Sequence, residues 1–167
     1  MQSAIRILGN LKYSQRTKSP FGKAQGQTLA QKQGLRYEKN VFQEFNRLKT
    51  LGYFGEIEYN PWFDYCDEFG SGLCCPDFII HTSNAVIVVE VKHTWVPEAI
   101  IKLDKLYSPI VANALNCPAV SLVICKNVTK DAPKAKFDLY NAIHSPERLL
   151  HWPKYGHIQW KPNTNIN

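Results

Sequence analysis

The chain has 167 residues, of which 44% are hydrophobic and 12% aromatic, as is typical of one folded domain around a single core. No stretch reaches the roughly 20 apolar residues that cross a membrane, and the first residues show no apolar signal segment, so we expect neither secretion nor a membrane partner. Five cysteines, two of them adjacent, argue against a disulfide scaffold and favour the reducing cytoplasm. The net charge of +6 favours a polyanionic partner.

The first part of the chain is strongly basic. Its basic residues before the first acid, Glu38, are Arg6, Lys12, Arg16, Lys18, Lys23, Lys32 and Arg36. With its glycines and proline, this composition predicts a loosely ordered basic arm over residues 1–26, followed by one domain over residues 27–167. The arm either binds a polyanion such as nucleic acid or is a solvated tail that aids solubility.

A helical pattern follows from Thr28 to Leu51, with Gly52 as a stop signal. Apolar side chains recur at helical offsets, namely Leu35, Val41, Phe42, Phe45 and Leu48. This spacing predicts that Glu38 lies near the centre of the buried face, where a carboxylate needs a partner. Alternatively, Glu38 lies near the helix start, partly exposed, and complements the helix dipole.

Short strands are predicted over residues 56–59 and 62–65, separated by a break at Asn60-Pro61, with a flexible loop at residues 70–72. The stretch from Cys75 to Lys92 then reads as two apolar strands joined by a polar turn. A turn centred on residues 83–84 places Asp77 opposite Glu90, on the same face of the sheet.

Two opposed carboxylates repel each other unless a cation lies between them or one is protonated. Lys92, two residues beyond Glu90, shares their face. The pattern therefore favours a site for a hard divalent cation such as Mg²⁺. The alternative is an edge strand on which Glu90 and Lys92 form a solvated pair.

The remaining elements follow in order. A helix is predicted from Pro97, with a kink or restart at Pro109, and it carries Lys102, Lys105 and Tyr107. A buried strand over residues 119–125, a helix over residues 132–143, a short helix in the tail and a strand over residues 157–160 complete the chain. We interpret the two lysines as contacts for a phosphate backbone, and Tyr107 as a further contact or a core residue.

Several common motifs are absent from the sequence. It contains no G-x-x-x-x-G-K-S/T and no G-x-G-x-x-G phosphate loop, so we expect no nucleotide cofactor. It also contains no C-x-x-C pair, so a cysteine metal site is not favoured.

The set of Glu38, Pro76-Asp77 and Glu90-Val91-Lys92 resembles the PD-(D/E)xK nuclease superfamily. The residues from Gly34 to Glu38 and the helix after Lys92 are similar to its phage and RecB-like branch, although Leu103 stands where that branch usually has Gln. The resemblance implies an α/β, restriction-endonuclease-like core with a central mixed sheet flanked by helices. The phage branch also implies a virus-encoded protein that acts in a host cell.

The resemblance further implies a Mg²⁺-dependent or Mn²⁺-dependent deoxyribonuclease. Asp77, Glu90 and the Val91 carbonyl would bind the ion, Glu38 would bind a second ion or an outer-shell water, and Lys92 would position the attacking water. The DNA contacts would come from Arg36, Lys102, Lys105 and Tyr107. An endonuclease or structure-specific enzyme, working as a homodimer, is slightly favoured over an exonuclease. The alternative is a catalytically inactive nucleic-acid-binding or assembly module with the same fold.

Overall fold

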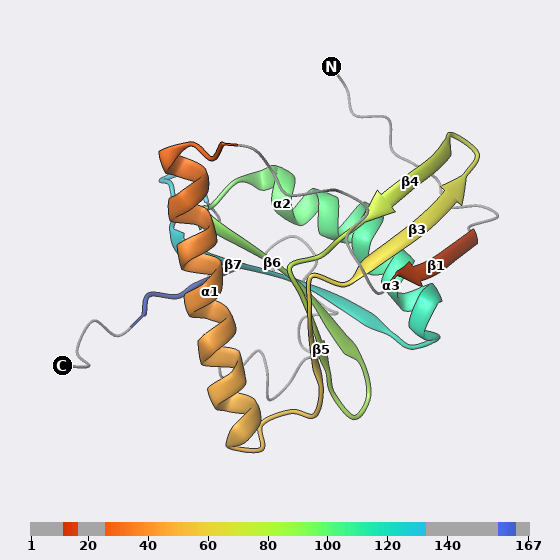
Figure 1. Cartoon of the computed structure of the whole chain (residues 1–167), viewed down its shortest axis with the longest axis horizontal. Helices are drawn as coiled ribbons and strands as arrows, with labels where there is room; N and C mark the ends of the chain where they lie inside the picture. The colour runs from red at the N-terminus through yellow and green to blue at the C-terminus, as the bar shows by residue number, and fades with distance from the viewer. Residues whose placement is uncertain (1–11, 17–25, 133–156, 163–167) are drawn as a thin grey trace.

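A five-stranded mixed sheet lies at the centre of the structure, a computed structural model that describes residues 12–16, 26–132 and 157–162 (Figure 1). Its strands, in spatial order, are β2 (Ile57–Tyr59), β5 (Phe78–His81), β6 (Val86–Thr94), β7 (Ala119–Asn127) and β8 (His157–Gln159). Strands β2, β5 and β6 pair antiparallel, whereas β6, β7 and β8 pair parallel. The parallel half is strongly apolar, as expected for strands covered on both faces.

The hairpin of β5 and β6 has the predicted register. Phe78 lies opposite Val89 and His81 lies opposite Val86. The turn is closed by the Thr82 main-chain N–H, which donates to the Ala85 carbonyl at 3.0 Å. Continuing this register one residue past Phe78 places Asp77 opposite Glu90.

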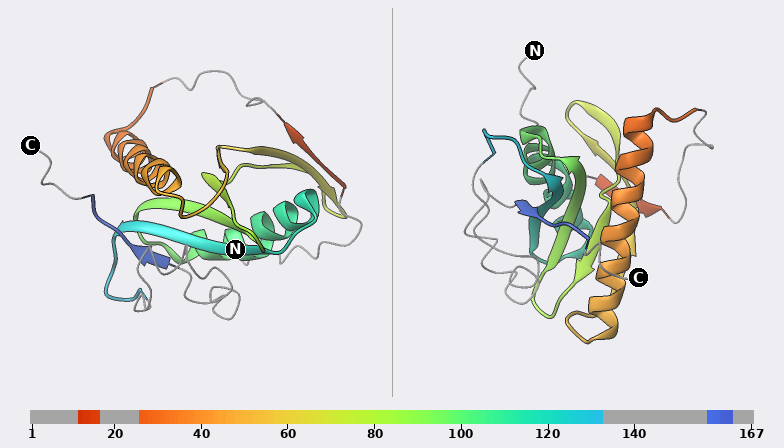
Figure 2. Two further views of the ribbon diagram at one scale, coloured as in Figure 1. Left: turned by 90° about the horizontal axis from the view of Figure 1, so that it is seen from below. Right: turned by 90° about the vertical axis from the view of Figure 1, so that its left-hand side faces the viewer.

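Helices cover both faces of the sheet (Figure 2). Helix α1 (Leu29–Thr50) packs on one face through its buried side chains, which are Tyr37, Val41, Phe45 and Leu48. The opposite face is covered by α2 (Pro97–Lys102), the π-helical turn η1 (Leu103–Tyr107) and α3 (Ser108–Leu115). The predicted α/β class, with a central mixed sheet flanked by helices, is therefore confirmed.

Helix α1 matches the predicted range, from Thr28 to Leu51, and ends before the predicted stop signal at Gly52. Thr28 caps its start: the Gln31 N–H donates to the Thr28 hydroxyl at 3.2 Å, and the Thr28 N–H donates to the Gln31 side chain at 2.8 Å. At the other end, Gly52 adopts a φ of 82°, a conformation that favours glycine after a helix.

The predicted position of Glu38 on α1 needs a correction. The buried face is centred nearer Tyr37, whose hydroxyl donates to the Trp160 carbonyl at 2.7 Å. Leu35 is 39% exposed. Since one helical residue turns the axis by about 100°, the inclusion of Tyr37 in the core moves Glu38 from the centre of the buried face to its edge.

The helical segment after β6 is interrupted by a π-helical turn just before its second proline, Pro109. Pro97 is in the first turn of α2, as predicted, and η1 follows before α3 begins with Pro109 in its first turn. Proline lacks an N–H and clashes with the carbonyl four residues earlier. The π-helical turn accommodates this interruption without ending the helical segment.

A second sheet of three antiparallel strands departs from the sequence-based expectations. It consists of β1 (Lys12–Arg16), β3 (Trp62–Asp67) and β4 (Gly70–Cys74), with β3 in the middle. Residues 12–16 were predicted to be loosely ordered, and residues 70–72 to be a loop. Both pair with β3 instead, because main-chain hydrogen bonds across strands require no hydrophobic pattern of their own.

Strands β2, β3, β7 and β8 confirm the predictions for these segments, with β3 and β7 longer than expected. The helix predicted over residues 132–143 and the short helix in the tail lie outside the described residues. Within the described ranges, no helix is both long and apolar enough to cross a membrane.

We predict that Gly72→Ala destabilises the protein. A Cβ at Gly72 would lie 2.5 Å from the ring of Tyr65, which is buried, so the free energy of unfolding should fall by about 1–3 kcal/mol. Gly34→Ala is the control, since a Cβ there meets no atom within 4 Å; in α1 it should raise stability by about 0.5–1 kcal/mol. Urea denaturation of both variants measures the difference, and equal effects would contradict the packing described.

Candidate active site

The pairing of β5 with β6 ends at Asp77. Pro76 has no N–H to donate, and the Asp77 side chain takes over as a hydrogen-bond acceptor at this point. Its Oδ2 accepts from the Val91 N–H at 2.6 Å, while its own N–H donates to the Val89 carbonyl at 3.1 Å. The carboxylate is therefore fixed where the two strands separate.

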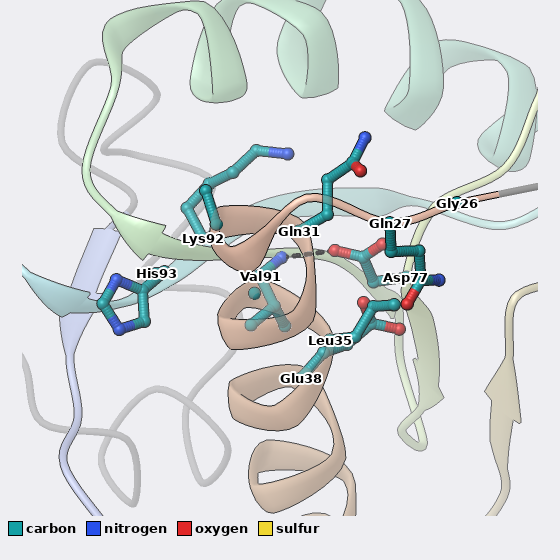
Figure 3. A pocket seen from close by; sticks show the side chains of 11 residues that line it. Gly26, Gln27, Gln31, Leu35, Glu38, Asp77, Val91, Lys92 and His93 are labelled. Carbon is teal, nitrogen blue, oxygen red and sulfur yellow. Dashed lines mark hydrogen bonds between the residues drawn. The ribbon is translucent and has the colours of Figure 1, made fainter.

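A cleft of about 580 Å³ lies between this end of the strands and the first turns of α1. Its lining residues are Gly26, Gln27, Ala30, Gln31, Gly34, Leu35, Glu38, Asp77, Val91, Lys92 and His93. Figure 3 shows the carboxylates of Asp77 and Glu38 on one side of the cleft and His93 on the other. The cleft thus brings together three of the four residues predicted to be catalytic, namely Glu38, Asp77 and Lys92.

The fourth, Glu90, is buried next to the cleft, with 3% of its side chain exposed. Its Oε1 accepts from Lys92 Nζ at 2.8 Å and from Lys102 Nζ at 3.0 Å. Its Oε2 is also buried, but it has no hydrogen-bond partner among the described residues. A buried carboxylate oxygen without a partner is unusual and carries a desolvation penalty.

Burial and neighbouring carboxylates raise the pKa values of Asp77 and Glu38. Burial, followed by the charges of Glu90 and Glu38, raises the pKa of Asp77 from 3.8 to about 7, against the opposing effects of the Val91 N–H and Lys92. Burial also raises the pKa of Glu38, with the charge of Glu90 adding to it and the hydrogen bond from Tyr59 opposing it. The cluster therefore has an excess of negative charge that a bound cation would relieve.

Tyr59 is a site residue that the sequence did not reveal. Its hydroxyl donates to Glu38 Oε1 at 2.8 Å, and its ring packs 4.8 Å from that of Phe42 and 5.4 Å from that of Phe78, between ring centroids. Tyr59 reaches Glu38 only because β2 lies beside β5, next to α1. No local pattern in the sequence signals this neighbourhood.

The residues predicted to contact nucleic acid occupy two kinds of position. Arg36, Lys102 and Lys105 are all exposed on helical surfaces. Tyr107, at the end of η1, is buried, and the Lys102 ammonium group lies over its ring, 4.4 Å from the centroid. Lys102 thus faces Glu90 instead of projecting only toward solvent.

The described residues contain no group of three or more His, Cys, Asp or Glu side chains that could hold a metal ion. Mg²⁺, however, is usually bound by one or two carboxylates, with water and substrate oxygens completing its shell. The unpartnered oxygen of Glu90 and the raised pKa of Asp77 fit such an ion.

No protein-family model matches the sequence, and no curated protein matches it either. Among solved structures, the chain is similar to the small subunit of the heterodimeric restriction endonuclease R.BspD6I, with a TM-score of 0.30 and 19% sequence identity. The match covers 55% of this chain and 50% of that one, so the chain spans about half the length of that subunit. At this TM-score the match supports no argument about what the chain does.

We predict that Glu90 depends on its two ammonium partners. In the double variant Lys92→Met/Lys102→Met, the buried carboxylate would lose both cations, and the free energy of unfolding should fall by about 3 kcal/mol. Adding Glu90→Gln should recover most of that loss, because it removes the uncompensated charge. Thermal and urea denaturation of the three proteins test this, and an unchanged stability in the double variant would contradict the charge pairing.

Proposed function

We propose that the protein is a metal-dependent DNA nuclease that hydrolyses phosphodiester bonds. The observation that carries the proposal is the buried Glu90, with two lysines on one oxygen and none of the described groups on the other, opposite Asp77 at the opening of the strands. In structural ion pairs, buried carboxylate oxygens usually have hydrogen-bond partners. A centre that binds a divalent cation and a phosphate accounts for both the acids and the ammonium groups.

Asp77 and Glu90, with the main-chain carbonyl of Val91, would hold Mg²⁺ or Mn²⁺, and Glu38 would hold a second ion or an outer-shell water. When bound, the ion lowers the pKa of a coordinated water and neutralises charge on the phosphate. The support for this ligand set is that burial, followed by the charges of Glu90 and Glu38, raises the pKa of Asp77.

The side chains of the chain itself supply the rest of the chemistry. Lys92 lines the cleft and is half-exposed, so its ammonium group can orient the attacking water or stabilise the negative charge that develops on the phosphate. Arg36 and Lys105, which are exposed, would contact neighbouring phosphates. Such contacts give affinity that falls with salt concentration and carries little sequence information.

The order of elements supports membership of the PD-(D/E)xK superfamily, with its restriction-endonuclease-like fold. Glu38 is on the first helix, Asp77 and Glu90 on the antiparallel hairpin, and a helical segment then leads to a parallel strand. We favour an endonuclease or structure-specific enzyme, such as a junction resolvase, over an exonuclease. We favour a homodimer, which would present two such sites to the two strands of a duplex.

We predict that Asp77→Asn and Lys92→Met each lower the cleavage rate by at least about a hundredfold. Asparagine keeps an acceptor for the Val91 N–H while removing the charge, so DNA binding and folding should persist. Glu56→Gln is the control, because Glu56 is 70% exposed and pairs with Lys49 at 3.5 Å, outside the residues that line the cleft. Full cleavage by either site variant would overturn the assignment of the cleft.

We also predict that cleavage requires Mg²⁺ or Mn²⁺ and stops with EDTA. Closed circular, linear and branched DNA, incubated with each ion, separate the possible activities by gel electrophoresis. Nicking of circles indicates an endonuclease, and loss of linear DNA alone indicates an exonuclease. Binding without cutting in any divalent ion would favour the inactive nucleic-acid-binding module, and the same assay on RNA tests the sugar preference.

A further inference from the structure

Lys102 contacts the same oxygen of Glu90 as Lys92 does. The two Nζ atoms lie 3.0 and 2.8 Å from Oε1 and come from different elements, the end of α2 and strand β6. Lys92 is placed there by strand geometry, since it is two residues from Glu90. Lys102 is ten residues further along the chain, and its arrival at the same atom requires a specific path of the helical segment.

The π-helical turn supplies that path. In a regular α-helix, residues five apart point about 140° away from each other. In η1 the hydrogen bonds span five residues, and the Ser108 N–H accordingly donates to the Leu103 carbonyl. This places Lys102 4.4 Å above the ring of Tyr107, five residues later. The ring face thereby contacts the ammonium group in addition to Glu90.

Lys102 also changes the charge of the centre. Three carboxylates, Glu38, Asp77 and Glu90, and two ammonium groups, Lys92 and Lys102, give −1 when all are ionised. One divalent cation brings the sum to +1, and one phosphodiester then brings it to zero. Without Lys102 the same centre would be neutral with the cation alone and would carry −1 with the phosphodiester.

We propose that Lys102 is a positioning residue that holds Glu90 Oε1 together with Lys92 and keeps the metal-loaded centre positive, so that it attracts a phosphate group. The inference rests on the proposed function and deepens it. The inference predicts two opposite effects of Lys102. Its positive charge weakens the binding of the metal ion, and it raises the rate of reaction at the phosphate. A lysine that merely stabilised the fold would not separate these two effects.

The test compares Lys102→Met with wild type by isothermal titration of Mn²⁺ without DNA, and by the cleavage rate at saturating Mn²⁺. We expect the Kd for Mn²⁺ to fall by about threefold or more, because a competing positive charge is removed. We expect the cleavage rate to fall by about tenfold or more, because the phosphate loses a positive charge. Lys102→Arg should move both quantities back toward wild type.

Two further variants separate the loss of the Lys102 charge from a folding defect and from a general effect of removing a surface lysine. Lys102→Gln retains a hydrogen-bond donor without charge, so it should reproduce both effects even if the apolar methionine disturbs folding. Lys49→Met, in the exposed pair with Glu56, is the control and should change neither quantity. Weaker Mn²⁺ binding by Lys102→Gln, or a cleavage rate equal to that of Lys49→Met, would overturn the inference.

The two proposals can fail separately. If wild type binds Mn²⁺ but cuts no nucleic acid, the proposed function fails, and the inference survives only as tighter Mn²⁺ binding by the Lys102 variants. If wild type binds no Mn²⁺, the inference is overturned. If wild type cuts DNA and the Lys102 variants match it in both measurements, the function stands and the role of Lys102 is wrong.

Discussion

The burial of Glu90 is the constraint on which the site depends. A carboxylate with 3% of its surface exposed is stable only with partners that compensate its lost hydration. Those partners come from β6 itself and from the end of α2. The packing of α2 against the sheet and the charge balance of the cleft therefore depend on each other. A shift of α2 would remove Lys102 from Glu90 and leave the buried carboxylate with one cation fewer.

The same region is where the sheet opens. Pro76 and Asp77 end the pairing with β6, and the Asp77 carboxylate, instead of a main-chain carbonyl, accepts from the Val91 N–H. The opening is covered by the first turns of α1, and the cleft lies between them. Tyr59, on β2, donates a hydrogen bond to Glu38. Residues of α1 and β6, together with Asp77, therefore line one cleft at the point where the strand pair ends.

Sequence patterns predicted the features that depend on residues close together in the chain. The polar turn and the alternation of side chains predicted the register that opposes Asp77 to Glu90, and Gly52 predicted the end of α1. Features that depend on spatial neighbours were not predictable in this way. Tyr59 reaches Glu38 through the order of the strands, β4 forms through pairing with β3, and Tyr37 rotates the buried face of α1 by taking a distant partner, Trp160.

Lys102 is a second example of a residue whose contacts depend on spatial neighbours. The sequence singled out this lysine, but it did not predict its contact with Glu90. A lysine pair three apart on a helix suggested a surface for phosphates, as an α-helical period implies. The π-helical turn changes that period directly after Lys102, so the ring of Tyr107 lies under this lysine. Removing one residue from the turn would rotate everything after it by about 100° and withdraw the ring from the ammonium group. The π-helical turn before Pro109 is therefore part of the candidate site, because it places the ring of Tyr107 under Lys102, the second lysine that contacts Glu90.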